Sequence, residues 1–131
     1  DVEEEKRLLE KLINYYEKLY PGVKFSVEKK VFTPEEIGEI LYTFAGAESE
    51  ATFEEETKLI MEELKRGYNT PVILLKKGNE YIILDGHRRL KVAWENSLNW
   101  PAFIIVPDKE LSFGIEKMII GKIKTLWFKK L

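Results

Sequence analysis

The sequence of 131 residues contains no cysteine and only one histidine. The lack of cysteine excludes disulfide bonds, thiol catalysis and thiolate metal sites, and one histidine cannot form a histidine-rich metal centre. No apolar run approaches the roughly 20 residues of a membrane-spanning helix, and no secretory signal pattern opens the chain. We therefore expect a cytoplasmic protein with no membrane partner. Because the chain begins at Asp1 rather than methionine, we also expect it to be cut from a longer protein.

The composition, with 44% hydrophobic and 34% charged residues, is that of one globular domain over residues 1–131. The formal net charge is −2. Acidic residues predominate in 1–66 (17 against 10 basic), and basic residues predominate in 67–131 (11 against 6 acidic). A basic second half is compatible with a phosphate-bearing ligand. The net charge does not favour DNA, because a duplex normally meets a more basic surface.

The first third of the chain carries clear helix and strand signals. Apolar residues at helical spacing predict a helix over 3–20, and residues 24–32 alternate as a half-buried strand does. The buried side of that strand is expected to carry Phe25, Val27, Lys29 and Val31. A capping box formed by Thr33 and Glu36, with Pro34 at the first helical position, predicts the next helix. Its expected apolar face is Ile37, Ile40, Leu41 and Phe44.

The remaining elements follow from turn and capping signals. Residues 45–51 are expected to form a loop, and a second capping box of Thr52 and Glu55 to begin a helix that ends at Gly67. Residues 71–76 and 80–84 form a predicted hairpin, followed by a helix from His87 and a strand over 101–107. A last helix is expected over 109–130, after Asp108. The predicted fold is α+β, a small mixed sheet with flanking helices.

The most informative segment lies between the second hairpin strand and the helix after it. A buried apolar strand ends at the turn signal Asp85-Gly86, so His87, Arg88 and Arg89 fall in the first helical turn. Unpaired backbone N–H groups and the helix dipole favour an anion there. Glycine allows close approach of a ligand, and arginine forks match phosphate oxygens. The sequence predicts a phosphate site at this junction.

The same residues also have a structural interpretation. Cations oppose the dipole of a first helical turn, where Asp, Ser or Thr is more usual. His87 could be a structural histidine, and the two arginines a solvated surface. We favour the functional interpretation because the three residues depart together from local preference. It requires both guanidinium groups to hold one anion. Internal pairing with carboxylates that leaves no room for an anion would refute it.

The segments Pro71-Val72-Ile73-Leu74 and Tyr81-Ile82-Ile83-Leu84-Asp85-Gly86-His87-Arg88-Arg89-Leu90 resemble the ParB/sulfiredoxin superfamily. The resemblance covers roughly residues 24–107 and leaves the helices at 3–20 and 109–130 as additions. It implies a small α+β domain with a helix before the hairpin. It also implies that a Gly-x-x-Arg turn, here Gly86 to Arg89, binds phosphates.

Three branches of this superfamily differ in the turn. Sulfiredoxins carry a catalytic cysteine at the position of His87, which a chain without cysteine cannot supply. Chromosome-partitioning ParB proteins carry Gly-Glu-Arg-Arg and bind CTP, and Gly86, Arg88 and Arg89 match this pattern. They continue into a helix-turn-helix module, for which the segment after the core is too short. Archaeal free-serine kinases carry Asp-Gly-His-His-Arg, which Asp85, Gly86, His87 and Arg89 match. Those kinases have a second portion that helps enclose the substrate.

Resemblance to the kinase branch also implies roles for single residues. Glu36, with Glu35 as second choice, would receive the proton of the substrate hydroxyl, although the capping box already explains Glu36. Asp85 would orient His87, help hold Mg²⁺ through water, or only shape the turn. The implied cofactors are ATP, ADP or CTP with Mg²⁺. The implied phosphate-binding residues are Gly86, His87, Arg88 and Arg89.

We therefore predict a nucleotide-binding ParB-like domain, with phosphate transfer to a small hydroxyl-bearing substrate as its specific activity. One alternative is a DNA-associated partition, regulatory or nuclease-like module that uses nucleotide as a switch. Another is a non-catalytic protein-interaction domain. In that case oligomers would form through the terminal helices, by Leu8 and Leu12 or by Ile119 and Ile123.

Overall fold

A computed structural model describes residues 1–44 and 50–129, with the backbone alone for 50–53. Within these residues six strands form one sheet in the order β1-β5-β3-β4-β2-β6. They are β1 (Phe25–Phe32), β2 (Leu41–Thr43), β3 (Val72–Lys77), β4 (Glu80–Asp85), β5 (Trp100–Pro107) and β6 (Ile119–Lys122). Neighbours pair antiparallel except β3 with β5 and β2 with β4, which are parallel. The predicted mixed sheet with flanking helices is confirmed.

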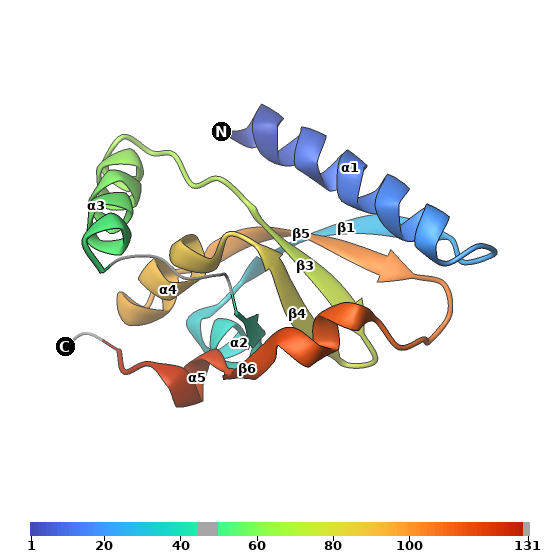
Figure 1. Ribbon diagram of the computed structural model, residues 1–131. Helices are drawn as coiled ribbons and strands as arrows, with labels where there is room; N and C mark the ends of the chain where they lie inside the picture. The colour runs from blue at the N-terminus through green and yellow to red at the C-terminus, as the bar shows by residue number, and fades with distance from the viewer. Residues whose placement is uncertain (45–49, 130–131) are drawn as a thin grey trace.

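Helices cover both faces of the sheet (Figure 1). They are α1 (Val2–Leu19), α2 (Pro34–Glu39), α3 (Glu50–Lys65), α4 (His87–Glu95), the 3-10 helix η1 (Gly114–Met118) and α5 (Ile123–Leu126). Helix α1 lies along one face, where Leu9 and Tyr16 pack on β3 and β5. Helices α2, α4 and α5 cover the other face. Each face thus has its own apolar core, and the sheet separates the two.

Two predicted helix ends are confirmed in detail. The hydroxyl of Thr33 accepts from the backbone N–H of Glu36, whose carboxylate accepts in return from the N–H of Thr33. Gly67 takes a positive φ of +87° after α3, and its N–H and that of Tyr68 donate to the carbonyls of Leu64 and Glu63. This pair of bonds satisfies two orphan carbonyls at the helix end.

The second predicted helix is shorter than expected. Helix α2 ends at Glu39, and Leu41–Thr43 form β2 instead of continuing the apolar helical face. Ile37 and Ile40 are buried as predicted, whereas Phe44 is exposed. The short run gains a sheet partner on each side, β4 and β6, and this tertiary pairing outweighs the local helical spacing.

Two other expectations for the first half need correction. Helix α3 begins at Glu50, so its start precedes the proposed capping residue Thr52, whose side chain lies outside the described residues. The expected loop at 45–51 lies outside them as far as residue 49. On β1 the side carrying Val27 and Val31 is exposed, because α1 covers only the Phe25 end of this edge strand.

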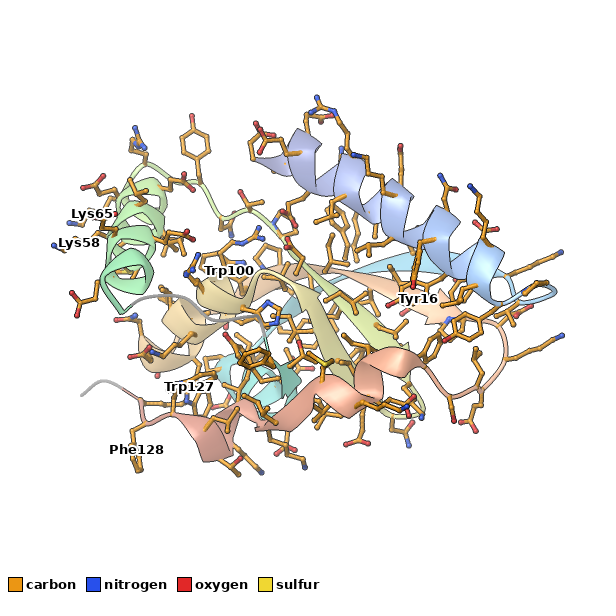
Figure 2. All side chains as sticks on the ribbon, in the orientation of Figure 1. Tyr16, Lys58, Lys65, Trp100, Trp127 and Phe128 are labelled. Atoms are coloured by element: carbon orange, nitrogen blue, oxygen red, sulfur yellow. The ribbon has the colours of Figure 1, made fainter. Side chains whose placement is uncertain are left out.

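The predicted C-terminal helix over 109–130 is wrong. The chain instead runs through η1 into β6 and the single turn α5. Gly121 has a φ of +146° opposite Tyr42 of β2, a conformation that breaks a helix and suits an irregular strand. Isoleucines such as Ile119, whose spacing suggested a helix, therefore lie in a strand that pairs with β2. Past α5, Phe128 projects from the body and is 95% exposed (Figure 2).

Among the helices of the described residues, none combines the length and the apolar character needed to cross a bilayer.

Candidate phosphate site at the β4–α4 junction

Gly86 is the residue that links β4 to α4, and its conformation requires glycine. It is the N-cap of α4 with φ +101° and ψ +28°, in the left-handed region. A Cβ at this position would lie 2.4 Å from Cγ1 of Val72, far inside normal contact. Gly86 also supplies no side chain to accept from the first N–H groups of α4. The first turn of this helix therefore lacks the usual side-chain cap.

His87 holds β2 against α4. Its Nε2 lies 2.8 Å from the hydroxyl of Thr43, and this hydroxyl lies 3.1 Å from the carbonyl of Ile83. Since a hydroxyl has one hydrogen, we assign that hydrogen to Ile83 and an Nε2–H donor to His87. Burial lowers the pKa of His87, so the ring is neutral near pH 7 and Nδ1 is an acceptor. The hydroxyl of Thr43 thus orients the ring.

Arg89 joins four segments of the chain. Its Nη1 donates to the carbonyl of Pro71 at 3.0 Å and lies 3.4 Å from that of Thr70. Its Nη2 lies 3.0 Å from Oδ2 of Asp85 and 3.2 Å from Oε1 of Glu5, in the first turns of α1. Only 17% of the Arg89 side chain is exposed. The guanidinium group therefore already has anionic and carbonyl partners on most of its edge.

Glu5 is an energetically poor partner for Arg89. Its side chain is 12% exposed, and its Oε2 is buried with no hydrogen-bond partner among the described residues. Burial, followed by the adjacent carboxyl of Asp85, raises the pKa of Glu5 to about 7, although Arg89 acts in the opposite direction. Ionisation of Glu5 is thus less favourable in the folded protein than in water, in spite of the nearby guanidinium group.

Arg88 turns to another helix. It forms an ion pair with Glu56 of α3, with 14% of the arginine side chain and 46% of the glutamate side chain exposed. The two arginines therefore pair with carboxylates of different elements: Arg88 with Glu56 of α3, and Arg89 with Glu5 of α1 and Asp85 of β4. This internal pairing is not the shared anion cradle that the sequence predicts, and it weighs against a preformed phosphate site.

The structure does not join Glu36 to this junction. Besides its capping box, Glu36 forms an ion pair with Lys30, and these contacts lower the pKa of its carboxyl. The ammonium of Lys30 lies 5.9 Å from the centre of the Tyr81 ring. Tyr81 precedes Asp85 by four residues of strand, roughly 13 Å. Glu35 is on the same first turn of α2. Asp85, Gly86, His87, Arg88 and Arg89 are adjacent, and neither glutamate has a described contact with them.

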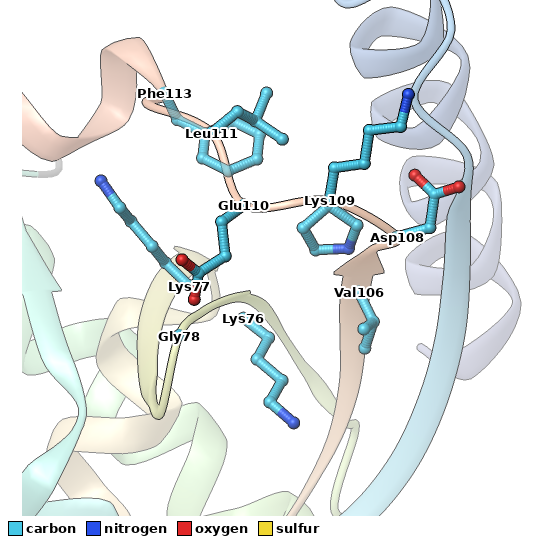
Figure 3. Close-up of a pocket in the computed structure, with 10 residues that line it drawn as sticks. Lys76, Lys77, Gly78, Val106, Asp108, Lys109, Glu110, Leu111 and Phe113 are labelled. Atoms are coloured by element: carbon cyan, nitrogen blue, oxygen red, sulfur yellow. The ribbon is translucent and has the colours of Figure 1, made fainter.

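A cavity of about 220 Å³ lies elsewhere, between the β3–β4 hairpin and the segment after β5 (Figure 3). Lys77, Lys109, Glu110 and Phe113 are among the residues that line it. It adjoins the turn that precedes β4, whereas Gly86 follows the other end of that six-residue strand. Its charged lining includes both signs, and it does not contribute to the junction.

Comparison with known proteins gives a match of limited extent. The chain is similar to an uncharacterized protein, MJ0188, of Methanocaldococcus jannaschii, with 38% identity over 60 residues. The match covers 44% of this chain and 23% of that protein, so the chain spans about a quarter of its relative's length. No family model matches the sequence.

Three residues of the junction were missed by the sequence reasoning: Glu5, Thr43 and Glu56. Glu5 did carry a signal, since it precedes Leu8 and Leu9 by three and four residues and so continues the apolar stripe of α1. A carboxylate on such a stripe needs a partner in the body of the protein. Thr43 and Glu56 gave no comparable signal.

Proposed function

We propose that the β4–α4 junction binds the phosphate groups of a cytoplasmic nucleotide, ATP, ADP or CTP, in a domain of ParB/sulfiredoxin type. The observation that supports this most is the poor fit of Glu5 against Arg89: a buried carboxylate with raised pKa and an orphan oxygen. A phosphate has more oxygen atoms for the arginine fork and could also accept from the uncapped first turn of α4. It would therefore be the better partner.

Arg88 would contribute by exchanging partners. Its pair with Glu56 joins a carboxylate that is 46% exposed to an arginine side chain of which only 14% is exposed. A guanidinium group buried to this degree needs an anionic partner. A phosphate would therefore have to take the place of Glu56, so that the charge of Arg88 stays paired. Mg²⁺ would arrive with the nucleotide, because the described residues contain no group of three or more metal-binding side chains. Phosphate-bound Mg²⁺ needs few protein ligands, so their absence is compatible with it.

Phosphate transfer to a small hydroxyl-bearing substrate is the more specific proposal. Transfer of this type depends mainly on positioning and charge neutralisation, with a base for the hydroxyl proton. Glu36 is committed to its cap and to Lys30. Better candidates for this base are Asp85 and the neutral His87, whose Nδ1 is an acceptor, because both lie at the proposed phosphate site itself. Formation of ADP from ATP only when a hydroxyl substrate is added would support this activity.

Binding itself is tested by calorimetry and thermal denaturation with ATP, ADP and CTP in the presence of Mg²⁺. We expect a bound nucleotide to raise the melting temperature by linkage. Arg88→Lys and Arg89→Lys keep the charge but lose the fork, and each should weaken binding about tenfold or more. Arg66→Lys, an exposed arginine at the end of α3, is the matched control and should bind as the natural chain does. Absence of binding to all three nucleotides, both in the natural chain and in a Glu5→Ala variant that lacks the internal carboxylate, overturns the proposal.

A second candidate, a non-catalytic interaction domain, is favoured by the internal pairing of both arginines. In that case Arg88 and Arg89 serve to fasten α3 and α1 to α4. Their replacement by lysine would then lower the midpoint of unfolding, and nucleotides would have no effect. The DNA-associated alternative has less support, because Lys122 and Lys124 also pair with a carboxylate, that of Glu39. Salt-dependent binding to a duplex would be its test.

A further inference from the structure

The first turns of α1 contact the proposed phosphate-binding residues through the side chain of Glu5. Val2, Glu3 and Glu4 are exposed, and the capping bond from the N–H of Glu4 to Asp1 stays within the helix. Glu5 is the first residue of α1 whose side chain is partly buried against the rest of the protein, and its Oε1 lies 3.2 Å from Nη2 of Arg89. The start of α1 is thus placed against the same guanidinium group that the proposed function assigns to phosphate.

The position of Glu5 is that of an internal substitute for an anionic ligand. Its Oε1 uses Nη2 of Arg89, the nitrogen that also contacts Asp85, while Nη1 is directed to backbone carbonyls. Glu5 therefore occupies a position on Nη2 of Arg89 at which an anion would bind. A phosphate oxygen can reach this nitrogen only after the side chain of Glu5 has moved, because Oε1 of Glu5 lies 3.2 Å from Nη2 and fills the position that the phosphate oxygen would take.

We propose that the start of α1 is an autoinhibitory latch, in which Glu5 occupies the place of a ligand phosphate on Arg89 and must leave before a nucleotide binds. This inference rests on the proposed nucleotide site and adds a regulatory element to it. Opening is local. Leu9 and Tyr16 anchor the rest of α1 in the core on its face of the sheet, so only the turn before Leu9 needs to unwind.

The test compares ATP binding, with Mg²⁺, to the natural chain and to Glu5→Ala by calorimetry. Alanine keeps helix propensity and removes the competing carboxylate. If the latch is open about one time in ten, Glu5→Ala should bind ATP about tenfold more tightly. Glu10→Ala removes an exposed glutamate from the same helix and should leave the affinity unchanged. Circular dichroism of both variants verifies that α1 and the sheet are retained.

Hydrogen exchange of the natural chain provides a second readout that needs no substitution. ATP should accelerate exchange of the backbone amides of residues 5–9 and leave those of 13–19 unchanged. Unaltered or weaker ATP binding in Glu5→Ala, together with unaltered exchange, would overturn the latch while leaving the nucleotide site intact. Absence of ATP binding in the natural chain and in Glu5→Ala would overturn both. Binding by Glu5→Ala alone would indicate a latch that is closed almost completely.

Discussion

Replacement of Glu5 with glutamine should make the protein more stable above neutral pH and should leave it unchanged near pH 4.5. The pKa of Glu5 is raised from 4.5 to about 7 by folding. Below pH 4.5 the carboxyl is protonated in both states, and its contribution to stability is fully present. Between pH 4.5 and 7 the unfolded chain loses the proton first, so the free energy of unfolding falls as the pH rises. Above pH 7 the loss is complete.

The size of this effect follows from the same two values. The interval from 4.5 to about 7 corresponds to about 3 kcal/mol. With 12% of the side chain exposed, solvent screening reduces this only slightly. Glutamine resembles the protonated carboxyl, because its oxygen can accept from Arg89 and its amide can donate to Asp85. We therefore expect the free energy of unfolding of Glu5→Gln to be about 3 kcal/mol higher than that of the natural chain at pH 8, and to be equal to it at pH 4.5.

Urea unfolding at several pH values between 4.5 and 8, followed by tryptophan fluorescence, measures this difference. The chain has three tryptophans as natural probes. His87 acts in the opposite direction, since its lowered pKa costs stability as the pH falls below 6.5, but it is common to both proteins and cancels. Glu10→Gln, on the exposed side of α1, should follow the natural chain throughout. Parallel stability profiles for Glu5→Gln and the natural chain would refute the assignment.

Three further predictions concern the junction and Glu36. Gly86→Ala should lower the free energy of unfolding by about 2–4 kcal/mol, because alanine is strained in the left-handed conformation and its Cβ would overlap with Val72. A second substitution, Val72→Ala, should restore part of the lost stability, measured as the midpoint of urea unfolding. Nitrogen NMR of the single histidine should reveal the Nε2–H tautomer of His87 with a pKa below 6.5. Thr43→Val removes the hydroxyl that contacts this ring and should lower the free energy of unfolding by about 1–3 kcal/mol. Glu36→Gln should lose less than about 1 kcal/mol and leave ATP affinity unchanged; a loss of nucleotide turnover would instead return Glu36 to catalysis.

The sequence predicted those parts of the fold that depend on local chemistry. Thr33 and Glu36 form their capping box and Gly67 ends α3, because both features need only residues a few positions apart. The failures are at β2 and β6. Leu41 and Ile119 belong to runs with helical spacing, and only the distant partner strand makes them extended. Single-chain periodicity contains no information about which segments meet.

The candidate site shows the same division. The strand, the glycine turn and the helix start were predicted from Asp85 to Arg89, and the left-handed Gly86 agrees with that interpretation. The partners of the arginines were not predicted, because Glu5 and Glu56 precede them by tens of residues. A charged residue on an apolar stripe, such as Glu5, was the available signal that the helix approaches a counter-charge.

The pairing of β1 with β5 has a consequence for how the chain folds during synthesis. Each residue of β1 is paired in register with a residue of β5, which is made roughly 70 to 80 residues later, and β1 lies at the edge of the sheet. A nascent chain that ends before Trp100 therefore exposes β1 as an unpaired strand with valines on its surface. The hairpin of β3 and β4, whose contacts are local, can form first and act as the template on which β5 and then β1 are added.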